Sequence, residues 1–107
     1  MKRTHLPKVL KRLHAELSLT FGEELFAVYL YGSQACGESR PDSDIDILVV
    51  LRNDFNYFSA VNKASVVTSA LSIEFETVIS CVFVTQQDYE QRHTPLLLNI
   101  RREGIPV

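Results

Sequence analysis

Apolar residues near the start of the chain recur every three or four positions, which is the spacing of one helix face. The members of this stripe are Leu6, Val9, Leu10, Leu13 and Leu17. Charged residues occupy the opposite positions, Pro7 falls where the first turn would lie, and Gly22 interrupts the pattern. We therefore expect an amphipathic helix that begins near Leu6 and ends before Gly22.

The middle of the chain alternates between short apolar runs and a second helical pattern. Runs rich in β-branched and aromatic residues predict strands at 25–31, 44–51 and 78–84, with a short closing strand within 105–107. A helix is expected from Tyr57 to a point between Ser72 and Phe75. Either Asn53 or Asp54 could cap the start of this helix, because both side chains accept hydrogen bonds from free backbone N–H groups.

The C-terminal stretch predicts two short helices. Thr85, three residues before an acidic residue, resembles a capping box, and Thr94–Pro95 combines an N-cap with a proline in the first turn. Gly104 is placed where a helix would end, and Arg101 and Arg102 are expected to face solvent there. The order of elements predicts a single α/β domain over residues 1–107, with helices packed on a small mixed sheet.

Composition excludes several classes of protein. A formal net charge of -2 disfavours bulk binding of nucleic acid, and no apolar run approaches the length of a membrane span. The two cysteines, Cys36 and Cys81, do not form a CxxC motif, which is typical of a reducing compartment. We therefore expect a cytoplasmic protein with no membrane contact and no secretion signal.

The residues that carry chemistry gather at the junction of the first two strands. Gly32 ends the first strand and lets a ligand approach the backbone, and Ser33 adds a hydroxyl group. Asp44 and Asp46 open the next strand two positions apart, so both carboxylates lie on one face, roughly 7 Å apart at their Cα atoms. Such a pair needs a cation, and Mg²⁺ with substrate phosphates is the expected partner. The pattern predicts a site for a metal-chelated nucleoside triphosphate.

The run from Gly32 to Asp46, GSQACGESRPDSDID, resembles the signature of the DNA polymerase beta-like nucleotidyltransferase superfamily. More narrowly, it resembles the minimal nucleotidyltransferases, small proteins encoded beside HEPN-domain toxins, and the segment 95–104 resembles the end of such proteins. The resemblance implies the polymerase beta-like fold, triphosphate contacts from Gly32 and Ser33, and two Mg²⁺ ions on Asp44 and Asp46. Arg40 would contact a phosphate or brace a neighbouring aspartate.

The family to which this resemblance points also supplies a third carboxylate from the next strand. Glu76 is the favoured candidate for this metal-binding and catalytic role, because it would share a face with Ser80 and Val82 if the strand began there. Glu74 is the alternative, although it is better placed to end the preceding helix. A third possibility is that no such carboxylate exists, which would remove a candidate general base.

The short chain leaves little room for a second substrate, so the acceptor is expected on another molecule. The resemblance implies a Mg²⁺-dependent protein adenylyltransferase that moves AMP from ATP to a tyrosine hydroxyl of a partner HEPN toxin, within a hetero-oligomer. That activity would make the chain an antitoxin. Two alternatives stay open: an antitoxin that neutralises its toxin by binding alone, and a nucleotidyltransferase that modifies tRNA or a small molecule.

Overall fold

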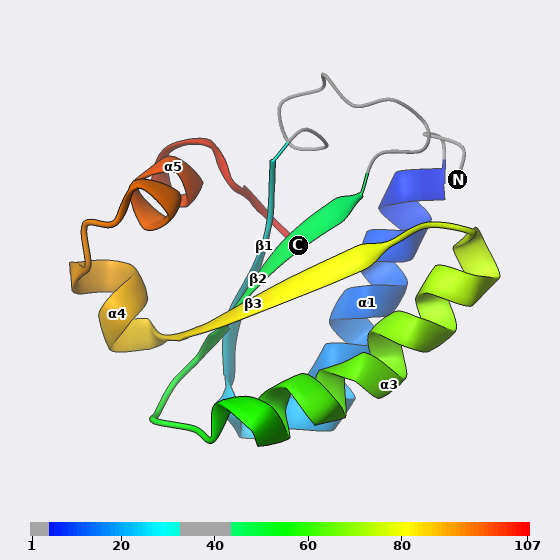
Figure 1. Ribbon diagram of the computed structural model, residues 1–107, viewed down its shortest axis with the longest axis horizontal. Coiled ribbons are helices and arrows are strands. Elements are labelled where there is room, and N and C mark those ends of the chain that lie inside the picture. Colours follow the sequence, from blue (N-terminus) through cyan, green and yellow to red (C-terminus); the bar gives the residue numbers. More distant parts are fainter. Residues whose placement is uncertain (1–4, 33–43) are drawn as a thin grey trace.

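A four-stranded mixed sheet with helices on both faces forms the protein (Figure 1). The computed structural model describes residues 5–32 and 44–107. Its elements are α1 (Leu6–Phe21), η2 (Gly22–Glu24), β1 (Leu25–Tyr31), β2 (Ile45–Leu51), α3 (Tyr57–Phe75), β3 (Ile79–Thr85), α4 (Gln86–Gln91), α5 (Pro95–Glu103) and β4 (Ile105–Pro106). The strand order is β3-β2-β1-β4, with β2 and β3 parallel and both other pairs antiparallel. The expected mixed α/β architecture is confirmed.

One face of the sheet carries the larger core. The odd-numbered residues of β2, from Ile45 to Leu51, point to this face, and α1 and α3 cover it (Figure 1). Leu13 and Leu17 of α1 and Leu71 of α3 are almost completely buried against these strand residues. An ion pair of 2.7 Å between Arg12 Nη1 and Glu74 Oε2 joins the two helices at their surface. The apolar stripe of the first helix therefore packs against the sheet, as its spacing predicts.

The other face of the sheet carries a smaller core. Leu48 and Val50 of β2 pack there with Leu97 and Ile100 of α5. Asp46 precedes them on the same side of the strand, because alternate strand residues share a face. The short helices α4 and α5 lie on this side, opposite α1 and α3 (Figure 1).

The helix caps agree with the sequence in two cases and differ in one. Thr85 accepts a hydrogen bond from the backbone N–H of Asp88, and Thr94 accepts one from Leu97, as predicted. The expectation of a cap at Asn53 or Asp54 is wrong, because Asn56 accepts from the Ser59 N–H at 2.9 Å. The helix itself begins at Tyr57, as expected. No helix within the described residues is both long and apolar enough to cross a membrane.

The third strand begins one residue later than the sequence predicted. β3 starts at Ile79, and Glu76 lies before it as the C-cap of α3, in the left-handed region with φ 52°. Glu74 lies in the last turn of α3, as expected. Because Glu76 is outside the strand, strand alternation does not place it on a face with Ser80.

Candidate active site

The predicted carboxylates and glycine come together because β1 and β2 run antiparallel. Tyr31, the last residue of β1, is paired with Asp46. Gly32 follows Tyr31, and Asp44 directly precedes β2. The end of one strand and the start of the next therefore place Gly32, Asp44 and Asp46 at the same end of the sheet. Ser33 and Arg40, the other predicted ligand contacts, lie outside the described residues.

Gly32 is the residue that allows the two strand ends to approach each other. Its φ of +77° lies in the left-handed region, which side chains with a Cβ rarely adopt. A Cβ at this position would lie 2.6 Å from Oδ2 of Asp46, closer than two such atoms can approach. Position 32 thus requires glycine for two separate reasons: its positive φ, and the lack of space for a Cβ beside the Asp46 carboxylate.

Negative charge is concentrated at this end of the sheet. Partial burial raises the pKa of Asp46, and the nearby charge of Asp44 raises it further. Burial also raises the pKa of the Tyr31 hydroxyl, with a second contribution from Asp46. Within 5–32 and 44–107, neither aspartate forms an ion pair with a basic side chain. A cation bound here would relieve the repulsion between the two carboxylates.

The position next to Asp46 on β3 is occupied by Ser80, not by a carboxylate. Among the described residues, no group of three or more His, Cys, Asp or Glu side chains is arranged to hold a metal ion. Glu76 is not gathered with the aspartate pair into such a group. The structure therefore brings together two of the three predicted metal ligands.

A small pocket beside Gly32 was not predicted from the sequence. It has a volume of about 150 Å³ and is lined by Tyr31, Gly32, Leu96, Asn99, Ile100, Glu103 and Gly104. The α5 residues among these recur at three- and four-residue intervals, so they form one helix face. That spacing was visible in the sequence, but only the packing of α5 against β1 shows that the face meets the strand end.

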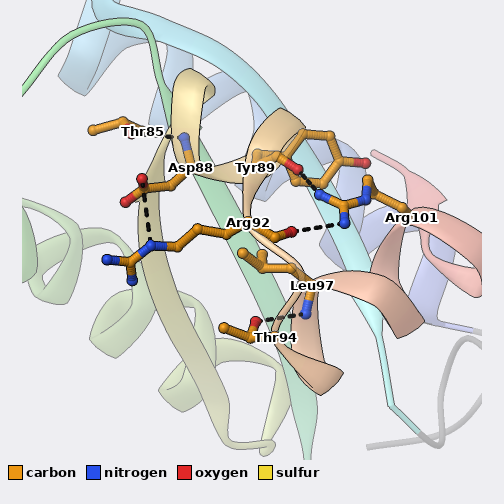
Figure 2. A network of polar contacts seen from close by, with 7 residues as sticks. All are labelled: Thr85, Asp88, Tyr89, Arg92, Thr94, Leu97 and Arg101. Carbon is orange, nitrogen blue, oxygen red and sulfur yellow. Dashed lines mark hydrogen bonds and ion pairs between the residues drawn. The ribbon is translucent and has the colours of Figure 1, made fainter.

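Arg101 was expected to face solvent, but its guanidinium makes contacts within the protein. Its guanidinium donates to the backbone carbonyl of Tyr89 and, at 2.7 Å, to that of Arg92 (Figure 2). It also lies 6.0 Å from the centre of the Tyr89 ring, which stacks on Tyr29 of β1. These contacts tie α5 to the end of α4 and hold both helices on the sheet.

Comparison with known proteins assigns the fold to a family of enzymes. The family model described as polymerase beta nucleotidyltransferase matches residues 17–107. The chain therefore belongs to the polymerase beta nucleotidyltransferase family, and the matched region includes Gly32, Asp44 and Asp46. The sequence has no significant match among curated proteins.

Solved structures show the same fold. A candidate minimal nucleotidyltransferase is 26% identical, with a TM-score of 0.63 over 100% of this chain and 97% of that one. A candidate nucleotidyltransferase from Sulfolobus solfataricus is 20% identical, with a TM-score of 0.67 over 97% and 80% of the two chains. A chain in the complex of the tri-AMPylated Shewanella oneidensis HEPN toxin with MNT antitoxin is 18% identical, with a TM-score of 0.55 over 99% and 71%. The predicted polymerase beta-like fold is confirmed.

Proposed function

We propose that this chain is a cytoplasmic antitoxin that transfers AMP from ATP to a tyrosine hydroxyl of a HEPN-domain toxin. One observation carries the proposal. Asp44 and Asp46 lie close enough for one charge to raise the pKa of the other carboxyl, beside a glycine that keeps one carboxylate uncovered. Membership of a nucleotidyltransferase family supports the class of reaction.

The aspartate pair fits Mg²⁺, which prefers oxygen ligands and is held by one or two carboxylates together with substrate phosphates. Bound Mg²⁺ supplies charge neutralisation for the phosphates and a lowered pKa for the attacking hydroxyl. Asp44 and Asp46 would hold two such ions, and Gly32, Ser33 and Arg40 would contact the triphosphate. The acceptor oxygen would then bond to the α-phosphorus as the bond to the bridging oxygen breaks and pyrophosphate leaves.

The proposed reaction needs a general base for the acceptor hydroxyl. Glu76 stays the favoured third carboxylate, although its position at the end of α3 requires its side chain to reach the aspartates from outside β3. An alternative route passes the hydroxyl proton to one of the two aspartates. Glu76→Gln distinguishes these routes, because only the first predicts a large loss of transfer.

A protein acceptor is supported by a structural relative. A chain of the same fold occurs in a complex of an AMPylated HEPN toxin with its antitoxin. We therefore propose a HEPN toxin as the partner and a hetero-oligomer as the working form.

The absence of a third gathered carboxylate favours one alternative function. Within the described part of the chain, the aspartate pair has no such neighbour, and Ser80 stands beside Asp46 on β3. A chain that lacked catalysis could still neutralise its toxin by covering it. This alternative predicts that protection from the toxin survives the loss of both aspartates.

The test is incubation of the chain with ATP, Mg²⁺ and the HEPN protein encoded beside its gene, followed by mass measurement of the intact HEPN protein. We expect mass increases of whole AMP groups. The double variant Asp44→Asn/Asp46→Asn should lose about a hundredfold or more of this transfer, because electrostatic contacts to the reacting groups contribute on that scale. Asp54→Asn is the matched control, since Asp54 is exposed in the loop between β2 and α3.

Two outcomes would contradict the enzymatic proposal. One is a HEPN protein whose mass stays unchanged with the wild-type chain. The other is a double variant that transfers AMP as fast as the Asp54→Asn control. If the double variant still binds the toxin and protects cells, the non-catalytic antitoxin becomes the better description.

A further inference from the structure

The pocket beside Gly32 begins at the catalytic end of the sheet. Gly32 lines it and also approaches Asp46, so the pocket and the carboxylate share one backbone turn. Its opposite wall is the face of α5 formed by Leu96, Asn99, Ile100 and Glu103. A nucleotide with its phosphates at the aspartates would therefore have this pocket as a neighbour.

The wall supplied by α5 is held in place by contacts at both helix ends. Thr94 caps the first turn by accepting from the Leu97 N–H, and the Gly104 N–H donates to the Ile100 carbonyl at 2.7 Å. Arg101 joins the helix to α4 through two backbone carbonyls (Figure 2). Ile105, two residues after α5, is paired with Leu30 of β1 and holds the helix end beside that strand. The shape of the pocket is therefore set before a ligand arrives, which reduces the entropy lost on binding.

The lining combines apolar walls with the Asn99 amide group and the Glu103 side chain. Tyr31, Leu96 and Ile100 offer an aromatic ring and two aliphatic side chains, which suit a flat, poorly hydrated ring. The exposed Asn99 carboxamide makes no hydrogen bond within the part of the chain that the structure describes. It offers a donor and an acceptor side by side in one plane. A volume of about 150 Å³ suits one ring system and not a whole nucleotide.

We propose that this pocket binds the base of the nucleotide substrate and that Asn99 makes the enzyme prefer adenine. The inference rests on the proposed function, because the position of the phosphates at Asp44 and Asp46 directs the base here. A carboxamide pairs with the exocyclic amino group and adjacent ring nitrogen of adenine, through one donated and one accepted bond. Guanine offers two acceptors at the equivalent edge, so one of the two bonds would be lost.

The experiment measures binding and transfer separately. Binding is titrated with ATP and GTP that carry a fluorescent group on the ribose, which leaves the base unmodified, in the presence of Mg²⁺. We expect the wild-type chain to bind labelled ATP about tenfold or more tightly than labelled GTP, since a bidentate contact discriminates on that scale. Asn99→Ala should weaken ATP binding, which loses two bonds, more than GTP binding, which loses one, and bring the two affinities within about threefold.

A matched control and a second variant keep the result interpretable. Asn62→Ala changes an exposed asparagine of α3, on the opposite face of the sheet, and should leave the ratio of affinities unchanged. Asn99→Asp keeps the shape of the side chain and the acceptor but removes the N–H donor and adds a negative charge, so it should weaken ATP binding. Circular dichroism melting of each variant shows whether the fold is intact.

Three outcomes would overturn the inference without affecting the proposed transfer. They are equal wild-type affinity for the two nucleotides, an ATP-to-GTP ratio that Asn99→Ala leaves unchanged, and an Asn99→Ala defect in the KM for the HEPN acceptor with normal ATP binding. The last outcome would assign the pocket to the acceptor. Conversely, an adenine preference that depends on Asn99 in a chain without transfer would support the pocket and contradict the enzymatic proposal.

Discussion

The two faces of the sheet differ in how completely they are covered. On one face, the long helices α1 and α3 bury a continuous core that includes Leu13, Leu71 and four residues of β2. On the other, the short helices α4 and α5 cover Leu48 and Val50, and the strand continues to Asp46, whose carboxylate is only partly buried. The same strand therefore supplies the centre of the core on one side and a carboxylate of the candidate site on the other.

Because of this difference, one face of β2 contributes to stability and the other contributes to the candidate site. Alternation at period two allows β2 to be apolar at every odd position and still carry Asp46 on its other face, with Asp44 directly before the strand. Full coverage of that second face would bury the two carboxylates without water, which is costly for charged groups. Asp44 is exposed and Asp46 is half-buried, so both carboxylates keep contact with solvent.

The largest effect on stability should follow from truncation of the fully covered face. Leu13→Ala should lower the free energy of unfolding by about 3–5 kcal/mol, because its side chain is completely buried between α1 and the sheet. Leu97→Ala, in the smaller core, should cost about 2 kcal/mol and should also weaken nucleotide binding by shifting α5. Urea denaturation and nucleotide titration measure both effects. If Leu97→Ala lowered the free energy of unfolding as much as Leu13→Ala or more, the difference in stability between the two faces would be contradicted.

Substitution of Gly32 should affect chemistry more than stability. Gly32→Ala introduces strain at positive φ, worth about 1–3 kcal/mol, and forces a Cβ against Asp46. We expect a loss of AMP transfer beyond what the stability change explains. Gly22→Ala is a matched control, because Gly22 also has positive φ but no atom lies within 4 Å of its added Cβ. If both variants transfer AMP equally well, the close approach to Asp46 has no catalytic importance.

Removal of a helix cap should have a smaller effect. Thr94→Ala deletes the acceptor for the Leu97 N–H at the start of α5 and should cost about 1 kcal/mol. Thr85→Ala deletes the equivalent cap of α4 and should cost a similar amount. Thermal melting measures the stability of each variant, and titration with labelled ATP measures its affinity for the nucleotide. Because Thr94 caps the helix that lines the pocket, Thr94→Ala should reduce ATP binding more than Thr85→Ala does.

The smallest effect concerns alkaline pH. Burial, with contributions from the Tyr29 hydroxyl, raises the pKa of Tyr89 from 10.0 to about 12. The unfolded chain thus loses this proton first, so the contribution of Tyr89 to stability is complete below pH 10 and disappears as pH rises to 12. Urea midpoints should fall less over this range for Tyr89→Phe than for the wild type. Parallel curves would show that the Tyr89 hydroxyl does not contribute.

Much of the fold was predictable because local signals agree with the tertiary structure. A few neighbouring residues are enough to predict the apolar stripe on α1, the alternation of β2 and the caps at Thr85 and Thr94. The cap of α3 was less predictable, since Asn53, Asp54 and Asn56 are all good caps within one short segment. The choice between them depends on the length of chain needed to cross from β2 to α3.

The candidate site was predictable only in part. Asp44 and Asp46 follow from strand alternation, and Gly32 follows from the end of the strand before them. The exclusion of Glu76 from β3 depends on where the sheet pairing starts, which one segment cannot show. The contacts of Arg101 and the position of Asn99 depend on how α5 packs, so their roles appear only when distant segments come together.

The pairing of β4 with β1 has a consequence for the order of folding. Tyr29 is paired with Pro106, so the end of α5 reaches its place beside Gly32 only after synthesis has passed Pro106. Contacts this distant in sequence carry a large loop-closure entropy and tend to form late. A growing chain would therefore carry both aspartates well before it acquires the wall that contains Asn99. The proposed metal binding and the proposed discrimination between bases would then arise at different times in the life of each molecule.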